Sequence, residues 1–198
     1  MVSLPALVLV GLVGGVQFLE TVLDGLNVQY GASAVRDAKT WVREALDVDD
    51  PEEMLAYQRS KTTLSGIRSW LGVGVVLAVV VSGLYGDLVR ALSATGLPSI
   101  AQGVVLLAGA VLAGRLLSAP FDAYETFVVE ERFGFNNRTV ALWLRDLVVG
   151  TVVALVFGGL IAGAILIAVD ALPTLWPVVG WALVVGFSLA MMVVYPRV

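Results

Sequence analysis

The sequence contains no histidine and no cysteine, and these two absences exclude several kinds of chemistry. Protein zinc sites are built mainly from imidazole and thiolate ligands, and most general-base catalysis near neutral pH uses histidine. Without cysteine the chain can form no disulfide and has no thiolate nucleophile. A histidine-dependent metalloenzyme is therefore excluded for this chain alone, and we expect it to hold no metal ion and no other cofactor.

Charged residues are also scarce. They make up 14% of the 198 residues, whereas 59% are hydrophobic and the mean hydropathy is +0.92. A soluble domain is about 45–50% apolar and about 25% charged, so this surplus of apolar residues cannot be buried in a water-soluble core. The net charge of −4 argues against a nucleic-acid partner, because no basic patch is present to displace counterions. The composition instead predicts an integral membrane protein whose partners are membrane lipids.

Five apolar stretches approach or exceed the roughly 20 residues that a membrane-spanning helix needs. The first has no basic residue before its apolar core, which is also too long for a signal peptide, so we interpret it as a retained helix. Small residues at helix-packing spacing occur in two of the stretches, as Gly11 with Gly15 and Gly159 with Gly163. The predicted fold is all-α, a single membrane domain over residues 1–198 with about five transmembrane helices, at residues 4–23, 67–85, 99–117, 147–169 and 175–195.

The basic residues predict the orientation, because Lys and Arg accumulate in cytoplasmic loops. They lie mainly between the first and second helices and between the third and fourth helices. We therefore expect the N-terminus outside the cell and the C-terminus in the cytoplasm. The acidic balance and the low lysine content favour a prokaryotic plasma membrane. The acidic run at residues 47–53 (DVDDPEE) is interpreted as a solvated loop.

Residues 115–150 carry the most informative pattern. If the third helix continues past Pro120 into the cytoplasm to about residue 131, polar side chains fall close to one face at spacings of about three to four residues: Arg115, Ser118, Asp122, Glu125 or Thr126, and Glu130. Tyr124 lies on the opposite side. Two interpretations stay open: a solvated face of a helix that leaves the membrane, or the wall of a water-filled cavity or docking face for another domain.

The residues after this extension predict a turn and a new helix. Gly134 is expected to take a left-handed conformation that ends the extension, with Asn136 or Asn137 as the N-cap of the fourth helix. Arg145 and Asp146 follow two turns later. Because charges near a bilayer are costly, we expect Arg145 to pair with a carboxylate of the third helix.

Several motifs in this segment resemble those of the N-terminal membrane domain of the CAAX prenyl endopeptidases, a family of integral-membrane zinc metalloproteases. These motifs are Pro120–Phe121, Tyr124, residues 126–130 (TFVVE), residues 133–136 (FGFN) and Arg145–Asp146, with weaker similarity at residues 57–61 (YQRSK). The resemblance implies a membrane domain that anchors the protease and forms part of the chamber that admits the substrate. It implies processing of CAAX proteins as the activity of the whole enzyme.

The resemblance also implies where the zinc of the family lies, on an H-E-x-x-H helix and a downstream Glu that follow the matched region. No zinc ligand and no catalytic residue can therefore be carried over, and we expect the family's catalytic domain to be absent and the chain to be inactive without a separate zinc-protease domain. The alternative is a non-enzymatic membrane scaffold or interaction protein that retains the family fold. The candidate chamber-lining or motif residues are Arg115, Asp122, Tyr124, Glu125, Glu130, Phe133, Gly134, Asn136, Arg145 and Asp146.

Overall fold

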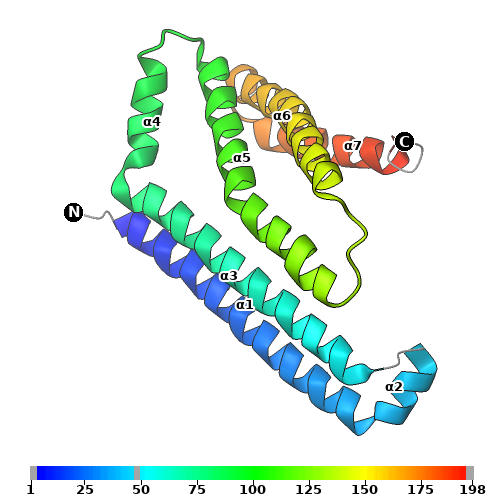
Figure 1. The fold of residues 1–198 in the computed structure, drawn as a ribbon. Coiled ribbons are helices and arrows are strands. Elements are labelled where there is room, and N and C mark those ends of the chain that lie inside the picture. Colours follow the sequence, from blue (N-terminus) through cyan, green and yellow to red (C-terminus); the bar gives the residue numbers. More distant parts are fainter. Residues whose placement is uncertain (1–3, 47–49, 195–198) are drawn as a thin grey trace. The chain divides into compact units, whose positions relative to one another are not determined.

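The computed structural model describes residues 4–46 and 50–194, and every regular element in those ranges is a helix (Figure 1). Five helical stretches there are long and apolar enough to cross a membrane. They are α1 (Leu4–Asp37), α3 (Pro51–Ser82), α5 (Ser99–Tyr124) with its π-helical continuation η1 (Glu125–Glu130), α6 (Val140–Ala171) and α7 (Trp176–Val194). Two shorter helices are α2 (Lys39–Leu46) and α4 (Leu84–Ser93). The predicted all-α fold with five membrane helices is confirmed, as is the extension of the third helix past Pro120.

The first two long helices extend well beyond their predicted apolar stretches. α1 continues to Asp37 instead of ending near residue 23, and α3 begins at Pro51 instead of residue 67. A hydropathy profile detects only the part of a helix that is apolar, and the additional turns contain charged residues. α2 and α4 were not predicted, because each is short and amphipathic.

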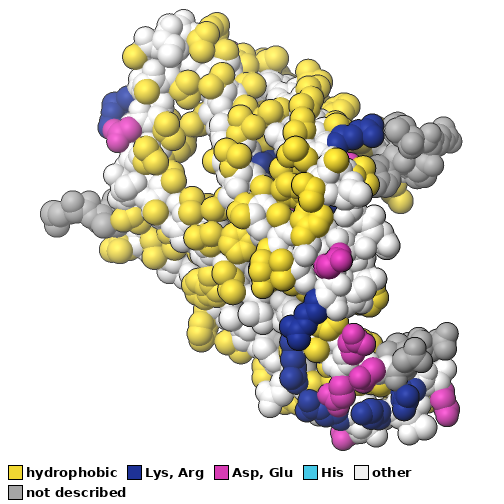
Figure 2. All heavy atoms as spheres, viewed as in Figure 1, with side chains coloured by type: hydrophobic (Ala, Val, Ile, Leu, Met, Phe, Trp, Pro, Cys, Tyr) yellow, Lys and Arg dark blue, Asp and Glu magenta, His cyan; other side chains and the backbone are white. Residues whose placement is uncertain are grey.

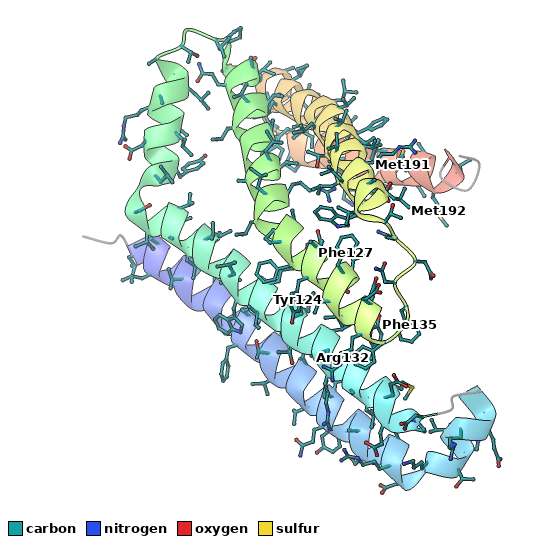
Figure 3. The ribbon with its side chains drawn as sticks, in the orientation of Figure 1. Tyr124, Phe127, Arg132, Phe135, Met191 and Met192 are labelled. Atoms are coloured by element: carbon teal, nitrogen blue, oxygen red, sulfur yellow. The ribbon has the colours of Figure 1, made fainter. Side chains whose placement is uncertain are left out.

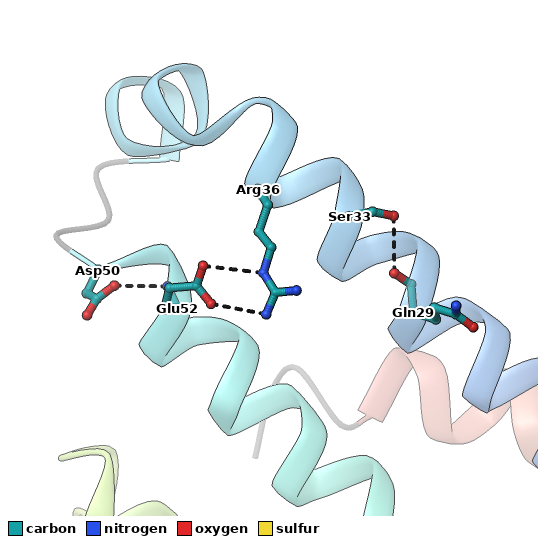
Figure 4. Close-up of polar contacts among 5 residues, drawn as sticks. All are labelled: Gln29, Ser33, Arg36, Asp50 and Glu52. Atoms are coloured by element: carbon teal, nitrogen blue, oxygen red, sulfur yellow. Dashed lines mark hydrogen bonds and ion pairs between the residues drawn. The ribbon is translucent and has the colours of Figure 1, made fainter.

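Local capping explains why α3 begins at Pro51. The side chain of Asp50 accepts a hydrogen bond of 2.9 Å from the backbone N–H of Glu52, and proline is well suited to the first helical position (Figure 4). Glu52 and Glu53 lie in the first turn, where the helix dipole favours negative charge. The loop predicted at residues 47–53 is therefore wrong from residue 51 onward, where α3 begins, whereas Asp50 is the extended N-cap and residues 47–49 lie outside the described residues.

The turn between η1 and α6 is partly as predicted. Gly134 has a left-handed φ of 73° after the end of η1, and the N–H of Phe135 donates to the carbonyl of Glu130 at 2.8 Å. The predicted N-cap at Asn136 or Asn137 is wrong. Asn136 instead caps the turn by accepting from the N–H of Arg138 (2.8 Å), and the hydroxyl of Thr139 accepts from the N–H of Leu142 (3.2 Å) at the start of α6.

The chain divides into two compact units. The first consists of residues 1–84 and 116–143, and the second of residues 85–115 and 144–198. In the first unit α1 and α3 run antiparallel side by side, with α2 at the turn between them (Figure 1). Polar contacts join the two helices: the Ser69 hydroxyl donates to the buried side chain of Gln17 at 2.7 Å, and the Trp70 indole donates to the hydroxyl of Thr21 at 2.9 Å.

In the second unit α5 and α6 approach closely through small residues. A Cβ atom at Gly103 would lie 2.7 Å from Leu166, and Cβ atoms at Gly159 and Gly163 would each lie 3.8 Å from Val104. Gly159 and Gly163 thus face α5, but a Cβ at either position would make only ordinary van der Waals contact, and the close approach is at Gly103. In contrast, a Cβ at Gly11 or Gly15 would meet nothing within 4 Å among the described residues, so the structure shows no close helix contact at that pair.

Exposed apolar side chains occur on all five long helices, including Leu7, Ile67, Leu116, Leu160 and Val178. Charged side chains of the first unit gather over α2 and the adjoining ends of α1 and α3, whereas hydrophobic side chains cover most of the face that Figure 2 shows. In that charged region Arg36 forms an ion pair of 3.4 Å with Glu52 (Figure 4). For the first unit, this is the distribution of a membrane domain whose charged end lies outside the lipid.

Candidate functional site

Two ion pairs join α3 to the end of α5 and to η1 in the first unit. Arg68 Nη1 lies 2.6 Å from Asp122 Oδ1, and Lys61 Nζ lies 2.8 Å from Glu125 Oε1. The four side chains are between 29% and 41% exposed. Ion pairing lowers the free-energy cost of placing these charged side chains close to lipid. It also directs the carboxylates of Asp122 and Glu125 toward α3.

An aromatic cluster continues this contact beyond the ion pairs. The ring of Tyr57 on α3 lies 5.3 Å from the ring of Phe133 and 4.9 Å from that of Phe135. Lys61 lies over the ring of Tyr57 at 5.4 Å, and Arg132 lies over the ring of Phe133 at 5.7 Å, within range of a cation–π interaction. The left-handed turn at Gly134 brings Phe135 back onto Tyr57. We call Tyr57, Lys61, Arg68, Asp122, Glu125 and Phe133 together the charged seam.

The π-helical segment η1 contributes Glu125 to the charged seam and is itself tightly packed. Thr126 and Val129 are buried within it, at 8% and 6% exposure. On its other side Phe127 packs edge-on against Trp143, with ring centroids 6.0 Å apart. π-helical segments are uncommon, and they occur frequently at functional sites.

A groove of about 670 Å³ lies between α3 and the end of α5 with η1. Its wall is mainly apolar, and the guanidinium groups of Arg59 and Arg132 are its only charged lining groups among the described residues. Figure 3 shows Tyr124 and Arg132 on the side of this segment that faces α3. The lining residues are Arg59, Ser60, Thr63, Leu64, Ile67, Pro120, Phe121, Tyr124, Val128, Val129, Arg132 and Phe133.

The predicted site residues fall into both units. The first unit contains Asp122, Tyr124, Glu125, Glu130, Phe133, Gly134 and Asn136, and the second contains Arg115, Arg145 and Asp146. Asp122, Glu125 and Phe133 contact α3 directly, whereas the Asn136 amide donates to Glu131 at 2.8 Å. Because Arg145 belongs to the second unit, its pairing with a carboxylate of the third span stays a prediction.

The sequence reasoning missed the partners that α3 supplies. Tyr57, Lys61, Leu64 and Arg68 recur at spacings of four, three and four residues, so they share one helix face. The acids opposite them, Asp122 and Glu125, are spaced in the same way. The available signal was a row of basic residues on one helix and a row of acidic residues on another. The predicted second helix begins at residue 67, after Tyr57, Lys61 and Leu64, so the basic row could not be recognised as one helix face.

The residues of the first unit do not fit the zinc ion that the family resemblance implies. Within residues 4–46 and 50–194, no three Asp or Glu side chains come together as a metal site would require. Asp122 and Glu125 are engaged by Arg68 and Lys61. We therefore assign no zinc-dependent step to these residues.

Comparison with known proteins gives a consistent result. Residues 34–198 match the family model described as CAAX prenyl protease N-terminal, five membrane helices. The chain is 33% identical over 99 residues to CAAX prenyl protease 1 homolog of Oryza sativa subsp. japonica, an alignment that covers 50% of this chain and 23% of that protein. For CAAX prenyl protease 1 homolog of Arabidopsis thaliana the identity is 36% over 90 residues, or 46% and 21% of the two chains.

The similarity extends to fungi. CAAX prenyl protease 1 of Saccharomyces cerevisiae is 35% identical over 89 residues, covering 44% of this chain and 20% of that protein. The alignments thus span between a fifth and a quarter of the length of these curated relatives. All three relatives are eukaryotic, so they lend no support to the prokaryotic origin predicted from composition.

Proposed function

This chain belongs to the family of CAAX prenyl protease N-terminal domains with five membrane helices, and from that premise we propose that it is the membrane part of a CAAX-prenyl-protease-like metalloendopeptidase. In this role it anchors the protease in the bilayer and forms part of the chamber that admits the substrate. The names of its relatives support protease membership, and its five long apolar helices support anchoring.

The charged seam is the observation that carries the chamber proposal. Ion pairs turn the carboxylates of Asp122 and Glu125 toward α3, so these polar groups line protein. A peptide substrate needs a polar surface beside the membrane, because each unsatisfied backbone group costs several kcal/mol in lipid, on the order of the transfer penalty of an amide. The paired basic and acidic side chains of the charged seam supply such a surface without presenting charge to acyl chains.

The catalytic chemistry must come from residues outside these 198, because the sequence contains no histidine for an H-E-x-x-H site. We therefore propose a zinc-protease part as the functional partner. The distribution of basic residues supports a cytoplasmic C-terminus, where such a part would act on CAAX proteins.

Reconstitution tests the proposal. The chain is placed in proteoliposomes together with a separately expressed zinc-binding H-E-x-x-H part of the family, and cleavage of a farnesylated CAAX peptide is measured. We expect cleavage that requires both components, and crosslinking of a photoreactive peptide to the segment between Pro120 and Phe133.

Two matched variants distinguish a role in the substrate chamber from a role as a membrane anchor alone. Glu125→Gln is expected to lower cleavage, whereas Glu53→Gln, on the exposed first turn of α3, is expected to leave it unchanged. Equal cleavage in the absence of this chain would contradict the proposed role. If the two components associate but the photoreactive peptide does not crosslink to this segment, the chain would act as an anchor only. That result would contradict the proposed role in the substrate chamber. Failure to associate with the zinc-binding part would favour a non-enzymatic scaffold.

A further inference from the structure

The groove between α3 and η1 contains two cations that no ion pair of the described residues uses. The four ion pairs in residues 4–46 and 50–194 engage Arg36, Lys61, Arg68 and Arg90. Arg59 and Arg132 take part in none of them, although both line the groove. Arg132 rests against the ring of Phe133, which leaves the edge of its guanidinium free to donate hydrogen bonds.

The groove is polar at one end and apolar at the other. α3 and η1 run antiparallel there, since Tyr57 contacts Phe133 while Arg68 contacts Asp122. Arg59 and Arg132 therefore lie toward the same end, and Ile67 and Phe121 toward the other. Arg59 precedes Ile67 by eight residues, which corresponds to about 12 Å along a helix.

This polarity matches the direction of the membrane. The apolar stretch of α3 begins just after Arg68, and the apolar stretch of α5 lies before Pro120 and is interrupted by Arg115. The apolar end of the groove thus points along both helices toward their membrane-spanning parts, and the two guanidinium groups lie on the side of the headgroups. An occupant should have an anionic head and an apolar tail in that order.

We propose that this groove binds an anionic phospholipid, with its headgroup phosphate between Arg59 and Arg132. One acyl chain would lie along Leu64, Ile67 and Phe121. Guanidinium groups bind phosphate oxygens in a bidentate manner, and basic pockets between transmembrane helices are known to select anionic headgroups. The proposal needs no protease activity, so it stands or falls separately from the proposed function.

Native mass spectrometry of the full chain in a neutral detergent provides the test. The chain is titrated with short-chain phosphatidylglycerol, with phosphatidylcholine of the same chain length, and with glycerol phosphate as a headgroup without a tail. We expect saturable binding of phosphatidylglycerol at one site, at least about tenfold tighter than that of phosphatidylcholine. Glycerol phosphate is expected to compete only weakly.

The double variant Arg59→Gln/Arg132→Gln should lose this preference. The matched control Arg43→Gln/Arg90→Gln removes the same charge from positions outside the groove and should retain it. If the first variant does not fold, as judged by circular dichroism, Arg59→Lys/Arg132→Lys keeps the charge without the bidentate fork and should bind several-fold more weakly.

Three results would overturn the proposal. Equal losses in the two double variants would indicate general electrostatic attraction instead of a site. An absence of preference over phosphatidylcholine, which contains the same phosphate but has no net charge, would remove the role of the net negative charge of the headgroup. Full competition by glycerol phosphate would indicate a phosphate site and no lipid site, since the apolar end of the groove would then contribute nothing.

Discussion

At the scale of single residues, the pair Arg68–Asp122 provides the most direct test of the charged seam. The 2.6 Å distance indicates a charge-assisted hydrogen bond, and both side chains are only partly exposed. We expect Asp122→Asn to lower the free energy of unfolding by about 1.5 kcal/mol, near the lower end for hydrogen bonds to charged groups. A double-mutant cycle with Arg68→Gln in detergent micelles, followed by circular dichroism, measures the coupling.

The surface pair Arg90–Asp87 serves as the control for this cycle. It links residues three apart on one helix, and both side chains are more than 60% exposed. Such pairs contribute about 0.3–0.5 kcal/mol, so Asp87→Asn should have a small effect. A coupling energy for Arg68–Asp122 no larger than that of the control pair would contradict a structural role for the ion pair.

Gly134 tests whether the turn after η1 depends on backbone conformation. Its φ is 73°, and a Cβ atom there would meet nothing within 4 Å. Gly134→Ala should therefore be destabilising by about 1–2 kcal/mol through left-handed strain alone, and Gly134→Asn by less. Gly66 lies within α3 and also has open space around it, so Gly66→Ala should be neutral or stabilising. Equal melting temperatures for the variants Gly134→Ala and Gly66→Ala would refute the strain argument.

At the scale of elements, the sequence predicts apolar helices well and their polar continuations poorly. The last two spans, predicted at residues 147–169 and 175–195, correspond to α6 and α7, because apolar composition covers most of their length. The start of α3 was missed although Asp50, Pro51 and Glu52 form a recognisable capping sequence. The acids of the charged seam could be placed on one face, but their partners on α3 could not, since the register between helices depends on tertiary packing.

The π-helical segment η1 sets the register of the charged seam. A π turn already accommodates one residue more than an α turn, so inserting one further alanine after Val128 should rotate the residues after it by about 100°, the angle between successive α-helical residues. Phe133 should then move away from Tyr57. Because the chain has no native cysteine, Tyr57→Cys/Phe133→Cys can be probed with a short bifunctional thiol reagent, and the insertion should abolish that crosslink. The control pair Arg36→Cys/Glu52→Cys reports on the contact between α1 and α3 and should still be crosslinked. An undiminished crosslink between residues 57 and 133 would contradict the proposal that η1 sets the register of the charged seam.

At the scale of the whole molecule, the distribution of basic residues predicts which side of the membrane each connection occupies. Ser93 ends α4, in the connection between the second and third spans, and Asn137 lies in the connection before α6. With the N-terminus outside, Ser93→Cys should react with an impermeant thiol reagent on intact cells, and Asn137→Cys should react only after permeabilisation. Labelling of residue 137 but not residue 93 on intact cells would reverse the orientation.

The last prediction concerns zinc binding by the whole chain. If the chain takes part in zinc-dependent proteolysis, we expect the zinc ligands to come from residues outside this sequence. A catalytic zinc site needs about three protein ligands and a water molecule, and this chain offers only carboxylates, which suit Mg²⁺ or Ca²⁺ better. Two carboxylates sharing a proton can also activate water, but Asp122 and Glu125 each pair with a different cation of α3 and form no carboxylate pair with each other. We therefore expect the purified chain to retain substoichiometric zinc after dialysis and to leave a farnesylated CAAX peptide intact. Zinc measured by atomic absorption at one ion per chain, or cleavage that a chelator abolishes, would show that carboxylates alone assemble a site here.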